Sequence, residues 1–122
     1  MEISDIYVHD GKLLRVIEDT EQEKLRMAVL LPASPTSDDL VPRLLVFEGV
    51  HGYQISEGRV DGAVTMLDLS VVGKSGNRSR VRLDTNRGYR EFYCTSGRVC
   101  EPSIEANQLH PANPRDSALV AC

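Results

Sequence analysis

The first residues that could do chemistry are a histidine and an aspartate side by side, His9-Asp10. An adjacent carboxylate can tune an imidazole as a general base, and such pairs occur in metal-dependent phosphohydrolases. Those enzymes need further ligands on helices, whereas Gly11 follows this pair and Asp-Gly is typical of a tight β-turn. The pattern therefore predicts that Asp10 forms a turn rather than a catalytic pair.

The remaining candidate ligands and nucleophiles are scattered. His51, His110 and the three cysteines do not show the short spacing of a zinc site. No serine lies in a GxSxG context, and no cysteine has a cation–His pair beside it that would lower its pKa. Residues 73–76, GKSG, lack the spacing of a phosphate loop. The sequence thus predicts no catalytic residue, no metal ligand and no cofactor.

Cationic side chains gather in one stretch, residues 74–98. It holds seven Lys/Arg and two Asp/Glu, a net charge of +5 within a chain of net charge −4. Arginines beside an exposed aromatic ring can bind phosphate, single-stranded nucleic acid or an acidic protein. The predicted binding residues are Arg78, Arg80, Arg82, Tyr93 and Arg87. A pI near 5.3 argues against nucleic acid and ranks an acidic protein partner above it.

A β-hairpin is predicted to position these side chains. Polar and apolar residues alternate over 78–84, an aromatic-rich segment follows over 89–95, and the turn residues 85–88 (TNRG) lie between them. A four-residue loop then places Arg82 opposite Glu91 and Val81 opposite Phe92. One slip in register would move every side chain to the other face, so this pairing is a specific prediction.

The same register gives the hairpin an apolar face, made of Val81, Leu83, Phe92 and Cys94. Arg90 also falls on this face. We expect it near the edge of the sheet, where its stem packs on apolar neighbours while its charged head reaches water.

Further strands are predicted before the hairpin. A type I′ turn at Asp10-Gly11 would join strands over 3–9 and 12–18, and a third strand over 24–31 would complete a meander. Thr20 and Glu23 resemble a helical capping box, but alternation and Pro32 favour the strand. Later strands are expected over 43–50, 53–56, 63–73 and 98–102, with a Pro-bounded loop over 33–42.

These segments predict an all-β fold, an antiparallel sandwich or partly closed barrel of about eight or nine strands with little helix. A length of 122 residues suits one domain. We assign residues 1–101 to it and residues 102–122 to an irregular, Pro-containing tail. An unpaired edge strand or this tail could support a homodimer.

Location is predicted from what the sequence lacks. No apolar run approaches the roughly 20 residues of a membrane helix, and residues 1–10 have neither the basic nor the apolar part of a secretory signal. Three cysteines, an odd number, favour free thiols in a reducing cytoplasm. We therefore expect a cytoplasmic protein without membrane contact.

The pattern aromatic-Val-His-Asp-Gly-x-Leu, followed by VIEDTEQEKLRMAVLLP and VFEGVHGYQI, covers roughly the first half of the chain. It resembles small bacterial all-β domains of uncharacterised or immunity-protein-like type. The resemblance implies a bacterial cytoplasmic domain that acts by binding, and it transfers no catalytic residue.

A non-enzymatic protein-binding or interaction domain therefore ranks first, with the outward face of the hairpin as its surface. One alternative is a small-ligand carrier, a β-barrel with an apolar cavity lined by Met27, Val46, Leu69 and Phe92. Another is a binder of single-stranded nucleic acid or phosphate through the basic hairpin. An enzyme ranks last, because the sequence offers no combination of acid, base and nucleophile.

Overall fold

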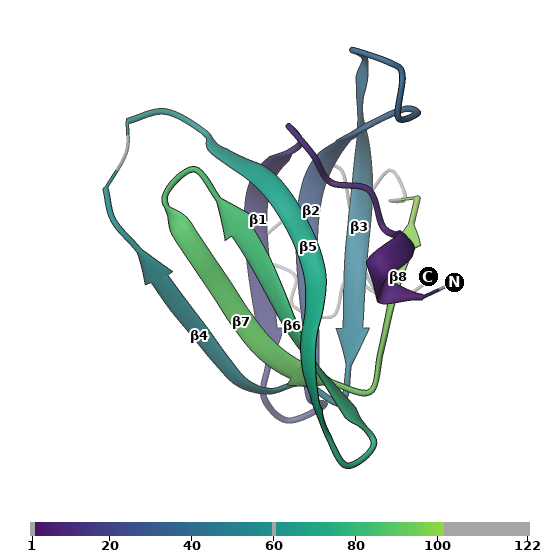
Figure 1. Cartoon of the computed structure of the whole chain (residues 1–122), viewed down its shortest axis with the longest axis vertical. Helices are drawn as coiled ribbons and strands as arrows, with labels where there is room; N and C mark the ends of the chain where they lie inside the picture. Colours follow the sequence, from purple (N-terminus) through teal and green to yellow (C-terminus); the bar gives the residue numbers. More distant parts are fainter. Residues whose placement is uncertain (1, 60, 102–122) are drawn as a thin grey trace.

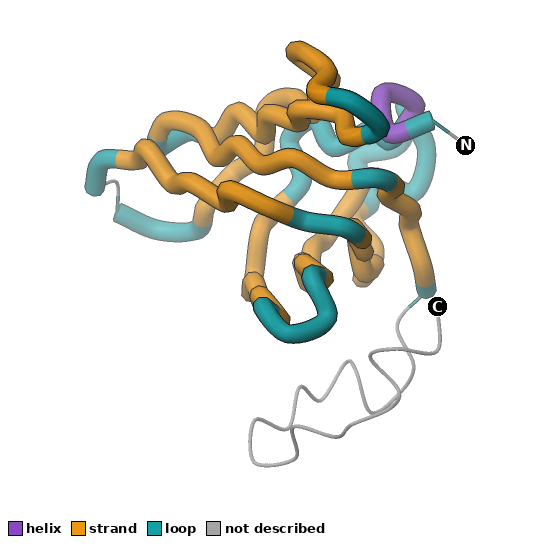
Figure 2. Tube along the Cα trace, turned by 90° about the horizontal axis from the view of Figure 1, so that it is seen from below, coloured by secondary structure: helices purple, strands orange, loops and turns teal. Residues whose placement is uncertain are grey.

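The computed structural model describes residues 2–59 and 61–101 of the chain. Its strands are β1 Lys12–Asp19, β2 Lys24–Pro32, β3 Leu40–Glu48, β4 His51–Glu57, β5 Val64–Ser75, β6 Arg78–Thr85, β7 Gly88–Cys94 and β8 Ser96–Cys100, and they follow a 3-10 turn, η1 Ile3–Asp5. The predicted all-β class and strand number are confirmed in this part of the chain. Figure 2 shows how little of it is helical.

The eight strands form one antiparallel sheet in the order β4-β7-β6-β5-β1-β2-β3-β8, which is not closed into a barrel. β5 connects its two halves, because Val64 and Thr65 pair with β1 while the rest of the strand pairs with β6. In Figure 1 the half β4-β7-β6-β5 lies in front of β1, β2 and β3. This folded sheet agrees with the predicted sandwich or partly closed barrel, and β4 and β8 are its edges.

The two halves pack on each other through one apolar core. Phe47 of β3 and Phe92 of β7 meet edge to face, with ring centroids 4.8 Å apart. Full burial of such side chains stabilises a fold by about 1.5–3 kcal/mol each. The largest fully buried side chains are Phe47, Phe92, Leu25, Met27, Leu45, Met66, Leu83, Val8, Val29, Val81 and Cys94.

The predicted hairpin is confirmed in register. Arg82 pairs with Glu91 and Val81 with Phe92, as the four-residue loop required. The predicted apolar face is also confirmed, since Leu83 and Cys94 are fully buried with Val81 and Phe92. β5, β6 and β7 form the expected meander.

The predicted strand over residues 3–9 is wrong. Ile3–Asp5 is a 3-10 turn, and Ile3, Ile6 and Val8 instead insert their side chains into the core. The turn at Asp10 is not type I′ either: Asp10 has φ +65, but Gly11 is outside the left-handed region. Gly11 is needed for a different reason, because an added Cβ would lie 2.6 Å from the carbonyl oxygen of Leu30.

The first meander is therefore β1-β2-β3 and starts at Lys12 rather than at Ile3. Strand β2 confirms the predicted strand over residues 24–31, so the helical alternative for this segment is wrong. The loop predicted over 33–42 is shorter than expected, because β3 already begins at Leu40. The last strand also lies two residues earlier than predicted, ending at Cys100.

The cysteines only partly follow the prediction. Cys94 is a free, buried thiol, and burial raises its pKa to about 11. Cys100 is disulfide-bonded, so the expectation of free thiols is wrong at this residue. The predicted tail, with His110 and Cys122, lies outside the described residues. In the part of the chain that the structure describes, no helix is long and apolar enough to cross a membrane.

Candidate interaction surface

Four of the five predicted binding residues lie on one side of the front half of the sheet, namely Arg78, Arg80, Arg82 and Tyr93. Because side chains alternate along a strand, Arg80, Arg82 and Asp84 of β6 point away from the core that Val81 and Leu83 fill. Tyr89, Glu91 and Tyr93 of β7 point to the same side, since they pair with these residues. We call this side of β4, β5, β6 and β7 the outer hairpin face.

Arg82 occupies the centre of this face and is engaged within the chain. Its Nε donates to Asp84 Oδ1 at 2.9 Å, and its Nη1 donates to Glu91 Oε2 at 3.4 Å. Its guanidinium also stacks 3.9 Å from the centroid of the Tyr89 ring. The hydrogen bond to Asp84 raises the pKa of Arg82. Two of its five N–H donors are thus bonded to carboxylates of the chain, and its charge is balanced by them.

Arg78 lies at one corner of the face, where β2, β4 and β6 begin. Its Nε donates to the carbonyl of Gly49 at 3.1 Å, and its Nη2 lies 2.9 Å from His51 Nε2. The same His51 nitrogen is 2.5 Å from Glu23 Oε2. One ring nitrogen cannot donate and accept at once, so Nε2 of His51 either donates to Glu23 or accepts from Arg78, according to which ring nitrogen carries the proton. A hollow of about 200 Å³ adjoins this corner, lined by residues 18–20, 23–24 and 50–52.

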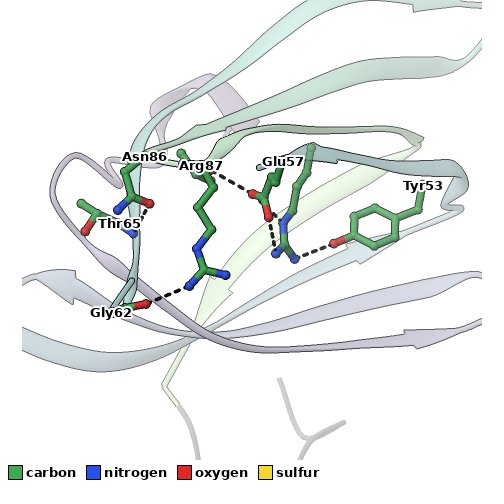
Figure 3. A network of polar contacts seen from close by, with 8 residues as sticks. Tyr53, Glu57, Gly62, Thr65, Asn86 and Arg87 are labelled. Carbon is green, nitrogen blue, oxygen red and sulfur yellow. Dashed lines mark hydrogen bonds and ion pairs between the residues drawn. The ribbon is translucent and has the colours of Figure 1, made fainter. Parts of the chain in front are cut away.

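Arg87 does not join the other cations. It lies in the turn between β6 and β7, where its Nη2 donates to the carbonyl of Gly62 at 2.8 Å (Figure 3). Its backbone N–H donates to Thr85 Oγ1 at 3.1 Å. These bonds tie the hairpin turn to the loop before β5, so Arg87 has a structural role that the sequence did not indicate.

Arg80 differs from the other three arginines. No hydrogen bond or ion pair joins it to any described residue, and its buried Nε has no acceptor there. It pairs with Tyr93 on one side and with Gly73 on the other. Arg80 packs over Gly73, where an added Cβ would lie 3.7 Å from the Arg80 Nε, an ordinary van der Waals contact.

Carboxylates make the outer hairpin face less basic than the sequence suggested. Asp68 pairs with Asp84, next to the row that contains Arg82 and Glu91. Like charges directly opposite each other are unfavourable, and the bond from Arg82 relieves this repulsion. The face is therefore polarised, with Arg78 and Arg80 near the β5–β6 turn and acidic groups near the β6–β7 turn.

The inner face of the same strands holds a polar network that sequence reasoning missed. Arg90 binds Glu57 with two bonds, Nε to Oε2 at 3.0 Å and Nη2 to Oε1 at 2.9 Å, and its Nη1 donates to the Tyr53 hydroxyl at 2.9 Å. Thr85 Oγ1 also donates to Glu57 (Figure 3). The side chains of Arg90 and Glu57 are only 13% and 7% exposed. The expectation that the charged head of Arg90 reaches water is wrong.

This network shifts the ionisation of its members. Burial by itself raises the pKa of Glu57, but the hydrogen bonds from Arg90 and Thr85 outweigh it and leave that pKa below its ordinary value. Burial by itself lowers the pKa of Arg90, but the hydrogen bonds and charges of Glu57 and Tyr53 together reverse this and leave that pKa raised. Burial raises the pKa of the Tyr53 hydroxyl. Both members of the ion pair therefore stay charged at neutral pH.

The His9-Asp10 pair lies away from this network, on the other side of the β5 start. His9 Nδ1 donates to the carbonyl of Leu67 at 3.1 Å, and its Nε2 is 3.5 Å from Asp10 Oδ2. Both side chains are well exposed, at 56% and 71%. Among the described residues, no group of three His, Cys, Asp or Glu could hold a metal ion. The geometry agrees with a turn in which Asp10 takes the left-handed position.

The four residues proposed to line a carrier cavity do not lie around one space. Met27, Leu69 and Phe92 belong to the main core, whereas Val46 belongs to a separate cluster with Leu44 and Cys100. Met27 and Phe92 are almost completely buried against other core side chains. This packing gives no support to a ligand cavity between them.

Comparisons with known proteins add no assignment. No protein-family model matches the chain, and no curated protein is significantly similar to it. The functional argument therefore depends on the geometry of the outer hairpin face.

Proposed function

We propose that the chain is a non-enzymatic interaction domain that binds an acidic protein segment at the Arg80 corner of the outer hairpin face. Arg80 carries this proposal, because it is the one predicted binding arginine whose side chain makes no hydrogen bond or ion pair with a described residue, whereas Arg87 shares only the unpartnered Nε. Arg82 and Arg87 are committed to internal acceptors, and Arg78 is held by Gly49 and His51. A carboxylate from a partner would bind the terminal Nη groups of Arg80, since its Nε is buried.

Two neighbours support an acidic partner rather than a neutral one. Tyr93 pairs directly with Arg80 and is half-buried, so it presents an aromatic surface beside the guanidinium. Arg78 lies on the same face of β6, two residues away. A segment with acidic side chains could contact both arginines, and the carboxylates near Asp84 would orient it by repulsion.

The test is an NMR titration of the whole chain with three probes, a hexaglutamate peptide, an oligothymidine and a hexalysine peptide. We expect the acidic peptide to shift the signals of Arg80, Tyr93 and His51. Loss of one charge-assisted bond in Arg80→Gln should weaken binding by about tenfold. Arg59→Gln is the matched control, because Arg59 is exposed in the loop after β4 and has no part in this face.

Each outcome decides between the functions considered. Equal binding of hexaglutamate by the wild type and Arg80→Gln would refute the proposal. Stronger shifts with oligothymidine than with hexaglutamate would favour the nucleic-acid alternative over the protein partner. Binding of hexalysine alone would instead point to the acidic end around Asp84.

The proposed setting is the cytoplasm of a bacterium, as the composition and the N-terminal resemblance imply. The disulfide at Cys100 is the observation against it, because cytoplasmic thiols are normally kept reduced. Alkylation of free thiols inside intact cells, followed by mass spectrometry, shows whether Cys100 is reduced or oxidised there. A reduced Cys100 in cells supports the cytoplasmic proposal, and an oxidised one refutes it.

A further inference from the structure

Strand β4 is an edge of the sheet, and β7 is its one neighbour among the described strands. Its bonding groups can be assigned from a single contact, the bond from Gly58 N–H to the carbonyl of Arg87 at 2.8 Å. In an antiparallel ladder, hydrogen-bonded pairs alternate with pairs that do not bond. The register continues from that pair without a break as far as Gln54, so every second residue of β4 bonds to β7.

The alternation divides β4 into two sets. Gln54 and Ser56 direct their N–H and C=O groups to β7, whereas Ile55 and Glu57 direct theirs away from it. The carbonyl of Tyr53 also points outward, because it lies opposite the N–H of Gln54 in the same peptide plane. One open edge therefore presents two donors and three acceptors.

This edge has only part of the usual protection against pairing, a bulge between His51 and Gln54 and the inward-pointing Glu57. Exposed edges are normally short or carry lysine or proline. Residues 53–57, YQISE, contain neither, and Ile55 is 55% exposed although it lies on the face that Tyr53 and Arg90 bury. The opposite edge, β8, is shorter, with five residues against seven for β4. β4 is thus the better template for another strand.

We propose that β4 pairs antiparallel with β4 of a second copy of this chain, with Ile55 opposite Ile55. In this register each Ile55 N–H donates to the Ile55 carbonyl of the other copy, and each Glu57 N–H donates to the other Tyr53 carbonyl. Both outward donors of each copy are then bonded, and the Glu57 carbonyl is the one outward acceptor of these three residues left without a donor. A strand from this same chain fits because its bonding pattern is complementary to itself.

The side chains agree with this register. The two exposed Ile55 side chains pack on each other, and each Gln54 faces a Ser56, so no like charges are opposed. A shift of two residues in one direction would place Ile55 against Glu57. The opposite shift would place Glu57 against the bulge between His51 and Gln54, where the spacing is irregular. The symmetric register is therefore the favoured one.

Pairing of this kind continues the sheet across both copies and leaves the two outer hairpin faces on the same side. An acidic partner could then contact two Arg80 corners at once. Dimer formation does not depend on that binding function, since Arg80 has no contact with β4 in the proposed interface. Arg80→Gln should dimerise as the wild type does, so the two proposals can fail separately.

The first test is analytical ultracentrifugation of the full chain from about 10 μM to about 1 mM, the range in which a small interface dimerises. We expect the wild type to convert from monomer to dimer. Ile55→Lys should shift the dissociation constant at least about tenfold, through burial of two like charges. Leu14→Lys is the matched control, because Leu14 has the same exposed fraction, 55%, on β1 within the sheet.

The second test reads the register residue by residue through amide hydrogen exchange. The N–H groups of Gln54 and Ser56 should be protected at every concentration. Those of Ile55 and Glu57 should become protected only as the dimer forms. A protein that stays monomeric throughout the range, or that dimerises without protection of Ile55 and Glu57, would overturn the proposal.

Discussion

Two arginines on the same hairpin, Arg82 and Arg90, bind carboxylates from opposite faces of one sheet. Arg82 lies on the outer face, with its side chain 37% exposed, and contacts acids on its own strand and on the next. Arg90 lies on the inner face, 13% exposed, and binds a carboxylate that is 7% exposed. The bond lengths, between 2.9 and 3.4 Å, are similar, so bond length alone does not distinguish the two arginines.

Their surroundings give the two ion pairs different roles. Water and salt screen the charges around Arg82, so that network contributes little to the fold. Arg90 and Glu57 are both desolvated, so a loss of either one would leave the other as an unpaired buried charge. Such a charge strongly destabilises the fold. Burial rather than bond length thus makes Arg90 the structural arginine. The ion pairs of Arg82 on the outer face can rearrange when a partner binds.

Removing the charge of Glu57 should have the largest effect. Glu57→Gln keeps the shape of the side chain but leaves a buried guanidinium without its counter-charge. We expect the free energy of unfolding to fall by about 3–5 kcal/mol, measured by urea denaturation. Glu91→Gln removes a carboxylate from the outer face and should cost far less. Equal losses in the two variants would contradict the distinction drawn between the faces.

A polar substitution on the inner face should have the next largest effect. Cys94→Ser places a hydroxyl among apolar side chains and should cost about 1–3 kcal/mol, whereas Cys94→Val keeps the site apolar and should cost less. The high pKa and burial of this thiol also predict that iodoacetamide modifies Cys94 only after unfolding. Rapid modification of the native protein would show that the inner face is open to solvent.

The pH dependence of stability should identify the same inner network. Glu57 has a lowered pKa when folded, so its stabilising contribution is complete above the unfolded value of about 4.5 and is lost as pH falls through the folded pKa. The unfolded chain takes up the proton first, and acid therefore favours unfolding. Urea denaturation from pH 7 to pH 3 should show a steeper decline for the wild type than for Glu57→Gln. Parallel curves would assign the acid sensitivity to other carboxylates.

The sequence predicted the outer pair but not the inner one, for a physical reason. Arg82 and Glu91 face each other across one tight turn, so alternation and the turn residues determine that they meet. Glu57 is 33 residues from Arg90, and nothing local shows that β4 returns to pair with β7. A signal did exist, since an arginine on an apolar face requires either water or a buried carboxylate as its partner.

The missing N-terminal strand has a similar origin. Alternation and Asp-Gly were both present around residues 3–11, but a strand also needs a neighbour with free bonding groups. Instead, Asp10 N–H donates to the carbonyl of Met66, and Met66 N–H donates to that of Gly11. These two long-range bonds attach the turn to β5, and the apolar residues before it fill the core as single anchors. The local sequence pattern thus identified which residues are buried, but not the backbone conformation of the segment that contains them.

The smallest effect is expected from Arg82 itself, and it gives the most direct test of the comparison. Arg82→Gln removes a cation whose two carboxylate partners keep access to water, so unfolding should change far less than in Glu57→Gln. The change should diminish further in 1 M NaCl, because salt screens exposed charges and hardly affects buried ones. The double variant Arg82→Gln/Glu91→Gln should therefore be close to additive at high salt, whereas Arg90→Gln/Glu57→Gln should remain strongly coupled. A salt-resistant coupling between Arg82 and Glu91 would mean that the outer face is as desolvated as the inner one, for example by a second molecule lying over it.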